Sequence, residues 1–178
     1  MAPRRAPALR KLAGRRGACI GRAADRCVGS RAVDPNKELE SIAQPLSARV
    51  TRAGLRSLSE PERTAYLVWS FAHELDNGGP DAFFYNASGR FAEQTVDALH
   101  SIAARELASA LEEVIEGFPD GEVPDDQEDR TEALDDAARD LEDALERLRE
   151  AYEDKGPERL RKATLRYWQA QSGSTPAE

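Results

Sequence analysis

Apolar residues recur three or four positions apart through most of residues 34–178, which is the spacing of helices that bury one face. This pattern predicts helices at 36–56, 59–76, 80–85, 91–103, 105–116, 128–154 and 158–171, the first of them interrupted near Pro45. Residues 1–33 show no sustained period and carry few large apolar side chains, so we expect them to be disordered.

Short motifs fix several of the expected helix ends. Ser59 and Glu62 have the spacing of a capping box, and Pro61 between them suits a first helical turn. The sequence Gly78-Gly79-Pro80 predicts that one helix stops and another begins, because glycine adopts positive φ and proline favours a helix start.

Two sets of apolar residues define the expected core. The helices between 91 and 116 turn one face inward, formed by Val96, Leu99, Ile102, Leu107, Leu111, Val114 and Ile115. The predicted helix 128–154 follows an acidic loop at 123–127 and carries a one-sided apolar row, here called the leucine stripe. The leucine stripe consists of Leu134, Ala138, Leu141, Leu145, Leu148 and Tyr152.

Composition narrows the fold class. Val, Ile and Thr together number 17, too few for a chain built mainly of strands. No stretch approaches the ~18 apolar residues of a membrane span, and two cysteines exclude a disulfide-rich scaffold. We therefore predict an all-α, compact multi-helix domain over residues 34–178. A long acidic amphipathic helix lies near its C-terminus, and a disordered basic tail of residues 1–33 precedes it.

The net charge of −8 hides a strong division along the chain. Residues 1–33 carry a net +8, residues 34–111 a net −4, residues 112–158 a net −15 and residues 159–178 a net +3. A division of this kind indicates interaction surfaces or tails rather than a particular fold.

Three interpretations of the basic tail stay open. It is incidental sequence, an arm that contacts nucleic acid or anionic lipid, or a segment that folds back onto the chain's own acidic region. No apolar stretch of the length of a secretory signal follows its arginine pairs, so we expect a cytoplasmic protein.

Residues 120–155 form a strongly acidic segment, and its carboxylates crowd the face opposite the leucine stripe. One interpretation is a solvated helix face, supported by the i, i+4 pairs Asp135–Arg139 and Asp143–Arg147. The other is a surface that imitates the phosphates of DNA, because neighbouring like charges at i, i+4 exceed what solubility needs. The candidate partner-binding residues are Glu132, Asp136, Asp140, Asp143 and Glu150, with Asp125 and Asp126 in the preceding loop.

The charge density sets a limit on mimicry. Residues 128–154 carry twelve acids and four bases. Spread over ~40 Å of helix, this net charge reaches about a third of the density of duplex DNA. Mimicry would therefore require the loop acids as well and a second copy of the chain.

The sequence offers little for catalysis. His73, Glu74 and Asp76 are the strongest candidates for an acid–base or metal group, but the second histidine of a zincin helix is missing. Cys19 and Cys27 fit no zinc spacing. We expect no catalytic residues, no metal site and no cofactor.

The segment 69–119 carries a run of residues with a family signature. It reads Glu74-Leu75-Asp76-Asn77-Gly78-Gly79-Pro80, followed by the aromatic pair Phe83-Phe84, then Asn86 and Gly89, with Phe118-Pro119 at its end. This block, bounded here as residues 59–119, resembles the family of DNA-mimic proteins first described from Neisseria and formerly catalogued as a domain of unknown function. Asp76 and Pro80 depart from the Asn and Phe usual in that family.

The resemblance implies an all-helical homodimer with an acidic surface that imitates DNA and binds a basic DNA-binding protein such as a transcription factor. It implies no direct binding of nucleic acid by the acidic body. A protein without mimicry is the alternative: a helical dimerisation module that pairs through the leucine stripe, with acids that serve only solubility. The signature residues are expected in turns and in the core rather than on the partner surface; they are Asn77, Gly78, Gly79, Phe83, Phe84 and Asn86.

Overall fold

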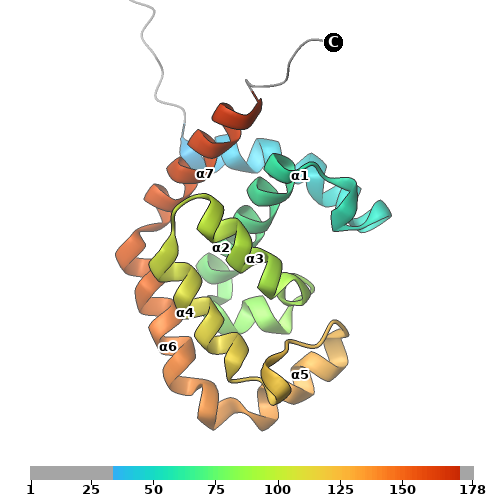
Figure 1. The fold of residues 1–178 in the computed structure, drawn as a ribbon, viewed down its shortest axis with the longest axis vertical. Coiled ribbons are helices and arrows are strands. Elements are labelled where there is room, and N and C mark those ends of the chain that lie inside the picture. Colours follow the sequence, from blue (N-terminus) through green and yellow to red (C-terminus); the bar gives the residue numbers. More distant parts are fainter. Residues whose placement is uncertain (1–33, 173–178) are drawn as a thin grey trace, which may run out of the picture. The chain divides into compact units, whose positions relative to one another are not determined.

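A computed structural model describes residues 34–172, and the predicted basic tail of residues 1–33 lies outside them. Within this range every regular element is helical, which confirms the all-α prediction (Figure 1). Three 3-10 turns, at Leu55–Ser57, Gly89–Phe91 and Pro119–Gly121, connect some of the helices. The helices are α1 (Pro35–Ala53), α2 (Glu60–Tyr85), α3 (Ala92–Ser101), α4 (Arg105–Glu116), α5 (Gln127–Asp136), α6 (Ala138–Lys155) and α7 (Pro157–Ser172).

Helix α2 is the centre of this unit, because α1, α3, α5, α6 and α7 all pack against it. Its fully buried Phe71 meets Phe83 edge to face, with ring centroids 5.0 Å apart. Phe84 continues this cluster to Phe118 at the end of the signature block, at a centroid distance of 5.3 Å. Each buried aromatic of this kind stabilises the fold by roughly 1.5–3 kcal/mol.

Helix α2 changes direction at Gly79, as the Gly78-Gly79-Pro80 motif predicts. Gly79 has φ 79° and ψ −174°, whereas the residues on either side are helical. The turn separates a first half, which packs on α1 and α7, from a short second half that carries Phe83 and Phe84 into the core. The predicted capping box at its start is also present, since the Glu62 carboxylate accepts the Ser59 backbone N–H at 2.8 Å.

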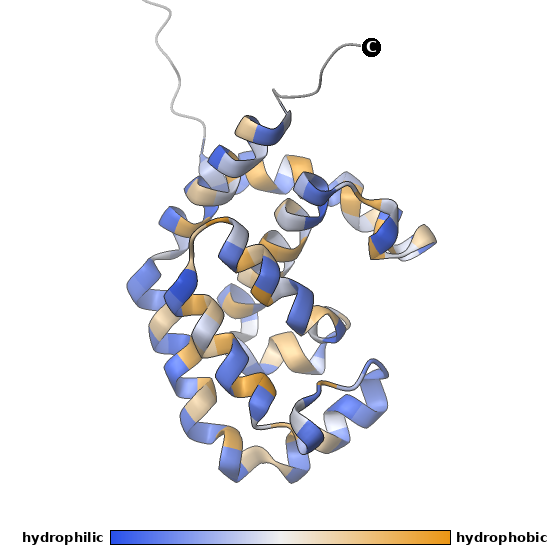
Figure 2. Ribbon diagram, in the orientation of Figure 1, coloured by the Kyte–Doolittle hydropathy of each residue, from blue (hydrophilic) through white to orange (hydrophobic). Residues whose placement is uncertain are grey.

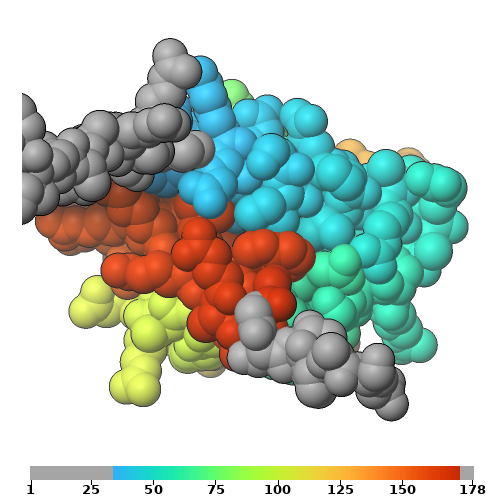
Figure 3. Space-filling view, turned by 90° about the horizontal axis from the view of Figure 1, so that it is seen from above, coloured from blue at the N-terminus to red at the C-terminus, as the bar shows by residue number. Residues whose placement is uncertain are grey.

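Helix α1 is not interrupted at Pro45, and that expectation was wrong. Leu39 and Ala43 before the proline, and Leu46 and Val50 after it, are all buried. Pro45 itself is exposed, so the backbone hydrogen bond it cannot donate is lost on the solvent side. Packing on α2 and α7 therefore carries the helix through. Figure 3 shows α7 lying along α1 on the upper face.

The predicted long helix 128–154 is two helices, α5 and α6, which meet at Ala137 (φ −90°, ψ 4°). The reason is tertiary packing. Leu134 on α5 is buried on the α2 side, whereas Leu141 and Leu148 on α6 are buried where α6 packs on α4 and α2. A straight helix would keep these side chains in one line, so the chain turns at Ala137 around the lower end of the unit (Figure 1).

Candidate protein-binding surface

The leucine stripe belongs to the core of the chain's own fold. Leu134, Leu141, Leu145, Leu148 and Tyr152 are buried, whereas Ala138 at the turn between the helices is exposed. The alternative in which this stripe forms a dimer interface is therefore wrong, because the chain's own α2 and α4 already cover it. Since the apolar side of α6 faces inward, its acidic side faces outward, and Figure 2 shows this hydrophilic outer side.

The outward acids of α5 and α6 define the candidate surface. Asp135 and Glu146 are engaged by neighbouring side chains, as described below. The remaining acids of both helices are exposed and form no ion pair with any residue in 34–172. We call these residues the acidic surface; they are Glu128, Asp129, Glu132, Asp136, Asp140, Glu142, Asp143, Glu150, Glu153 and Asp154.

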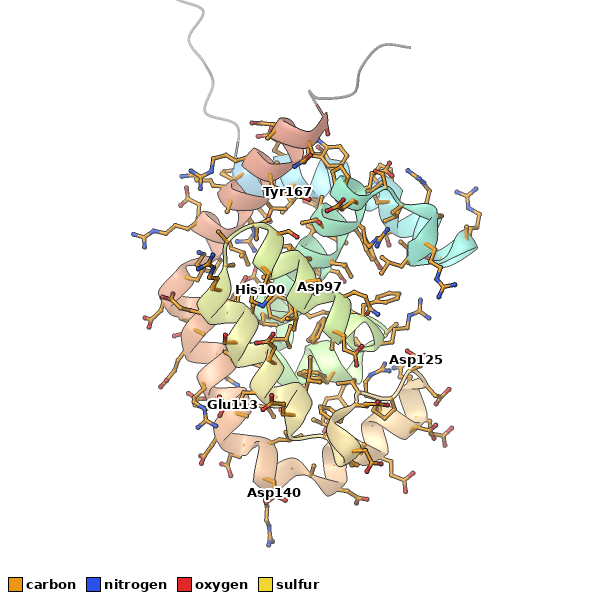
Figure 4. All side chains as sticks on the ribbon, viewed as in Figure 1. Asp97, His100, Glu113, Asp125, Asp140 and Tyr167 are labelled. Atoms are coloured by element: carbon orange, nitrogen blue, oxygen red, sulfur yellow. The ribbon has the colours of Figure 1, made fainter. Side chains whose placement is uncertain are left out.

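The structure places all seven predicted partner-binding residues at exposed positions but does not align them along one helix. Asp140, Asp143 and Glu150 lie on α6, and Glu132 and Asp136 lie on α5 beyond the turn at Ala137. The other two, Asp125 and Asp126, precede α5. Figure 4 shows Glu113, Asp125 and Asp140 on the outer side of the lower half of the unit.

Asp126 has a structural role, as the N-cap of α5, that the sequence did not reveal. Its carboxylate caps α5 by accepting the backbone N–H of Glu128 at 2.8 Å and that of Asp129 at 3.3 Å. This capping occupies one of its oxygens and satisfies N–H groups that have no partner inside the helix. Asp126 is therefore less available to a partner than Asp125.

The two predicted i, i+4 ion pairs do not form. Arg147 reaches across to α4, where it contacts Glu113 through two hydrogen bonds of 2.6 and 2.8 Å, rather than Asp143. These bonds lower the pKa of Glu113. Asp135 accepts the Tyr85 hydroxyl at 2.6 Å rather than pairing with Arg139. Asp143 consequently forms no ion pair among residues 34–172, although the Arg147 charge is still close enough to interact with it.

The hydrogen bond to Asp135 also changes the chemistry of Tyr85. A phenolate beside a carboxylate is unfavourable, and the hydrogen bond, helped by burial and by the charges of Asp135 and Asp81, raises the pKa of Tyr85 to about 12. Tyr85 therefore stays neutral and keeps donating to Asp135 throughout the physiological range.

Arg130 is the residue that sequence reasoning missed. It is completely buried, and its guanidinium donates to the carbonyl oxygens of Phe84 (2.7 Å) and Asn86 (2.9 Å) at the end of α2. It also donates to the carbonyls of the three residues that directly precede α5, namely Pro124, Asp125 and Asp126. Burial lowers the pKa of Arg130. Arg130 thus ties the acidic segment to the signature block.

Gly89 explains how Arg130 fits so closely. A Cβ atom built at Gly89 would lie 2.8 Å from the Arg130 Nε and 2.8 Å from the Phe83 carbonyl oxygen. Only a residue without a side chain leaves room there. The last glycine of the signature and an arginine 41 positions later therefore form one packing unit, a link that no local pattern contains.

The signature residues lie in the turn and core of α2. Phe83 and Phe84 are buried, and Gly79 forms the turn. Asn77 donates to the His73 carbonyl at 2.6 Å. A Cβ at Gly78 would lie 2.5 Å from that of Ala82. Asn86 ends α2 and donates to Glu74 at 2.7 Å.

The three residues considered for catalysis, His73, Glu74 and Asp76, form separate contacts. Glu74 accepts from Asn86 and, at 3.1 Å, from the Ser88 hydroxyl, whereas Asp76 accepts the Tyr152 hydroxyl at 2.7 Å and contacts Arg161. His73 is exposed and stacks on Trp69 at a centroid distance of 5.5 Å. Both carboxylates hold α2 together with neighbouring segments. None of the described residues forms a group suited to a metal ion.

The fold and its outer side define an all-helical protein with an exposed acidic surface on α5 and α6. The chain belongs to the DMP19-like protein family, whose model matches residues 56–171. This match spans both the signature block and the helices of the acidic surface. No curated protein and no solved structure matches the chain. None of the helices within 34–172 is long and apolar enough to cross a membrane.

Proposed function

We propose that this chain is a non-catalytic binding protein that imitates DNA and binds a basic DNA-binding protein such as a transcription factor. The observation that carries the proposal is the acidic surface: ten exposed carboxylates on α5 and α6 that form no ion pair within residues 34–172. Carboxylates placed in this way attract a groove that is lined with Lys and Arg for phosphates.

The positions of the bases on α5 and α6 leave most of the negative charge of the acidic surface unneutralised. Arg130 presents no guanidinium to a partner because it is buried. Arg147 is engaged by Glu113, and Arg149 lies 3.3 Å from Glu146. Two bases of these helices form no ion pair in the described residues: Arg139, which is exposed, and Lys155, which is half-buried in the last turn of α6.

A homodimer is part of this proposal. Residues 128–154 would reach only about a third of the linear charge density of duplex DNA even as one straight helix. They turn at Ala137, so a second copy of the chain would have to supply further carboxylates. The leucine stripe is buried, so such a dimer would use another part of the molecule.

The test is salt-dependent capture of DNA-binding proteins. The full chain is immobilised and exposed to proteins that elute from duplex DNA-cellulose, prepared from the cells that produce it. We expect capture at low salt, loss of capture at high salt and release by added duplex DNA, because screening shortens to ~3 Å at 1 M salt.

Two double variants of equal charge change make this test specific. Asp143 and Glu150 lie seven residues apart on the outer side of α6, ~10.5 Å along the axis, and Asp143→Lys/Glu150→Lys should abolish capture. Glu40→Lys/Asp97→Lys alters α1 and α3 and should leave capture intact. Equal capture by both variants, or captured proteins that still bind DNA, would overturn the proposal. Circular dichroism verifies that both variants fold.

A further inference from the structure

A groove runs beside the acidic surface, between the second half of α2 and the helices α5 and α6. It offers about 270 Å³ of space. Small-molecule sites usually enclose ≈ 300–1,000 Å³, so this groove has the size for a side chain rather than for a cofactor. Its floor is apolar and consists of Leu134 and Leu145, with the exposed Ala138 at one side.

An exposed aromatic ring forms one wall of this groove. Tyr85 is 38% exposed, and no other large apolar residue among residues 34–172 is exposed to this extent. Its orientation is fixed, because its hydroxyl donates to Asp135 and its carbonyl accepts from Gln127 at 2.9 Å. A tyrosine that is held rigid at the surface provides a ring face for a cation at little entropic cost.

Carboxylates line the opposite rim. Glu142 is exposed and has no ion pair within residues 34–172. At the other end of the same groove the chain's own Arg149 lies 3.3 Å from Glu146 and 3.9 Å from Asp81. The groove therefore already accommodates one guanidinium, while its Tyr85–Glu142 end has no cation.

We propose that this end of the groove is a socket for an arginine side chain of the basic partner. The aliphatic stem lies on Leu134, Leu145 and Ala138, while the guanidinium faces the Tyr85 ring and binds the Glu142 carboxylate. This inference rests on the proposed function and specifies how its partner is recognised. Phosphates of DNA offer no apolar floor and no ring, so the socket adds a preference for arginine that charge mimicry alone would not give.

Arginine and lysine carry the same charge, so a comparison of their binding distinguishes the socket from the rest of the acidic surface. Only arginine has a planar group that stacks on an aromatic ring and forms two parallel hydrogen bonds with a carboxylate. A diffuse acidic surface would bind both residues almost equally.

The experiment measures binding of two fluorescent peptides that differ only in having arginine or lysine at every third position. We expect the full chain to bind the arginine peptide roughly tenfold more tightly at physiological salt, as one cation–π contact and one bidentate pair provide. Equal affinities for the two peptides would overturn the inference.

Four variants locate the effect. Tyr85→Leu, which keeps apolar bulk without a ring, and Glu142→Gln should each abolish the arginine preference. Tyr85→Phe, which keeps the ring but loses the hydrogen bond that fixes it to Asp135, should retain a smaller arginine preference. Asp143→Asn on the outer side of α6 should weaken the binding of both peptides equally. An arginine preference that survives Tyr85→Leu would also overturn the inference.

The two proposals fail separately. If the arginine preference is found but no DNA-binding protein is captured in competition with DNA, the socket is supported and DNA mimicry is refuted. If capture depends on Asp143 and Glu150 but the chain does not distinguish arginine from lysine, DNA mimicry is supported and the socket is refuted.

Discussion

At the scale of single residues, Arg130 has the largest structural role in the acidic segment. Its five carbonyl acceptors come from two stretches of chain about 40 residues apart, the end of α2 and the start of α5. A charged group taken out of water is costly unless it is fully hydrogen-bonded, and here every guanidinium nitrogen has an acceptor. The result is a defined position for the helix that carries Glu132 and Asp136.

Replacing Arg130 with Met should therefore destabilise the protein by about 3 kcal/mol or more, because buried carbonyl oxygens at the end of α2 lose their donor. Urea unfolding followed by circular dichroism measures this change. Arg139→Met removes the same charge from an exposed position of α6 and should change stability by about 0.5 kcal/mol or less. Similar midpoints for the two variants would show that Arg130 does not hold the acidic segment in place.

At the scale of the elements, the backbone of α2 depends on one glycine. Gly79 has φ 79° and ψ −174°, a region that only glycine occupies without strain. This conformation directs Phe83 and Phe84 into the core and brings Tyr85 to the groove. The turn in α2 thus connects the family signature to the proposed arginine socket.

Gly79→Ala should cost about 1–3 kcal/mol, because alanine would have to adopt this conformation in the folded state. The space near Gly79 is not the cause, since the nearest atom to an added Cβ is the flexible end of Arg149 at 3.4 Å. Thermal unfolding gives the measurement. An alanine variant with unchanged stability would mean that the turn tolerates a side chain and that the helix can relax there.

At the scale of the whole molecule, the residues that stabilise the fold differ from those to which the proposed function assigns binding. The apolar sides of α5 and α6 hold the unit together, and their acidic sides are exposed, where the proposed partner would bind. Removing leucine-stripe residues should therefore act on folding, whereas reversing surface charges should act on binding.

Leu148→Ala tests this separation. The side chain is fully buried, so its truncation should cost about 2–5 kcal/mol of folding stability. Light scattering at high protein concentration should still give the mass of the parent protein, which we expect to be twice 19.6 kDa for the proposed dimer. A variant that keeps its stability but halves its mass would place the leucine stripe in a dimer interface after all.

Much of the fold was predictable because its signals are local. Helix periodicity, the Ser59–Glu62 capping box and the Gly79 turn each depend on residues within a few positions of one another. The same periodicity assigned opposite sides of the acidic segment to leucines and carboxylates, and the buried leucines of α6 agree with it.

What the sequence alone determined about this protein is the helical class, most helix ends and the concentration of negative charge in residues 112–158. Only the tertiary structure decided that α1 continues through Pro45, that the long helix turns at Ala137, that Arg130 is buried and that Tyr85 shares a groove with Glu142. The physical reason is that these features depend on contacts between different segments of the chain, as Arg130 depends on Phe84, 46 positions before it. No periodic pattern within one segment records which other segment will cover it.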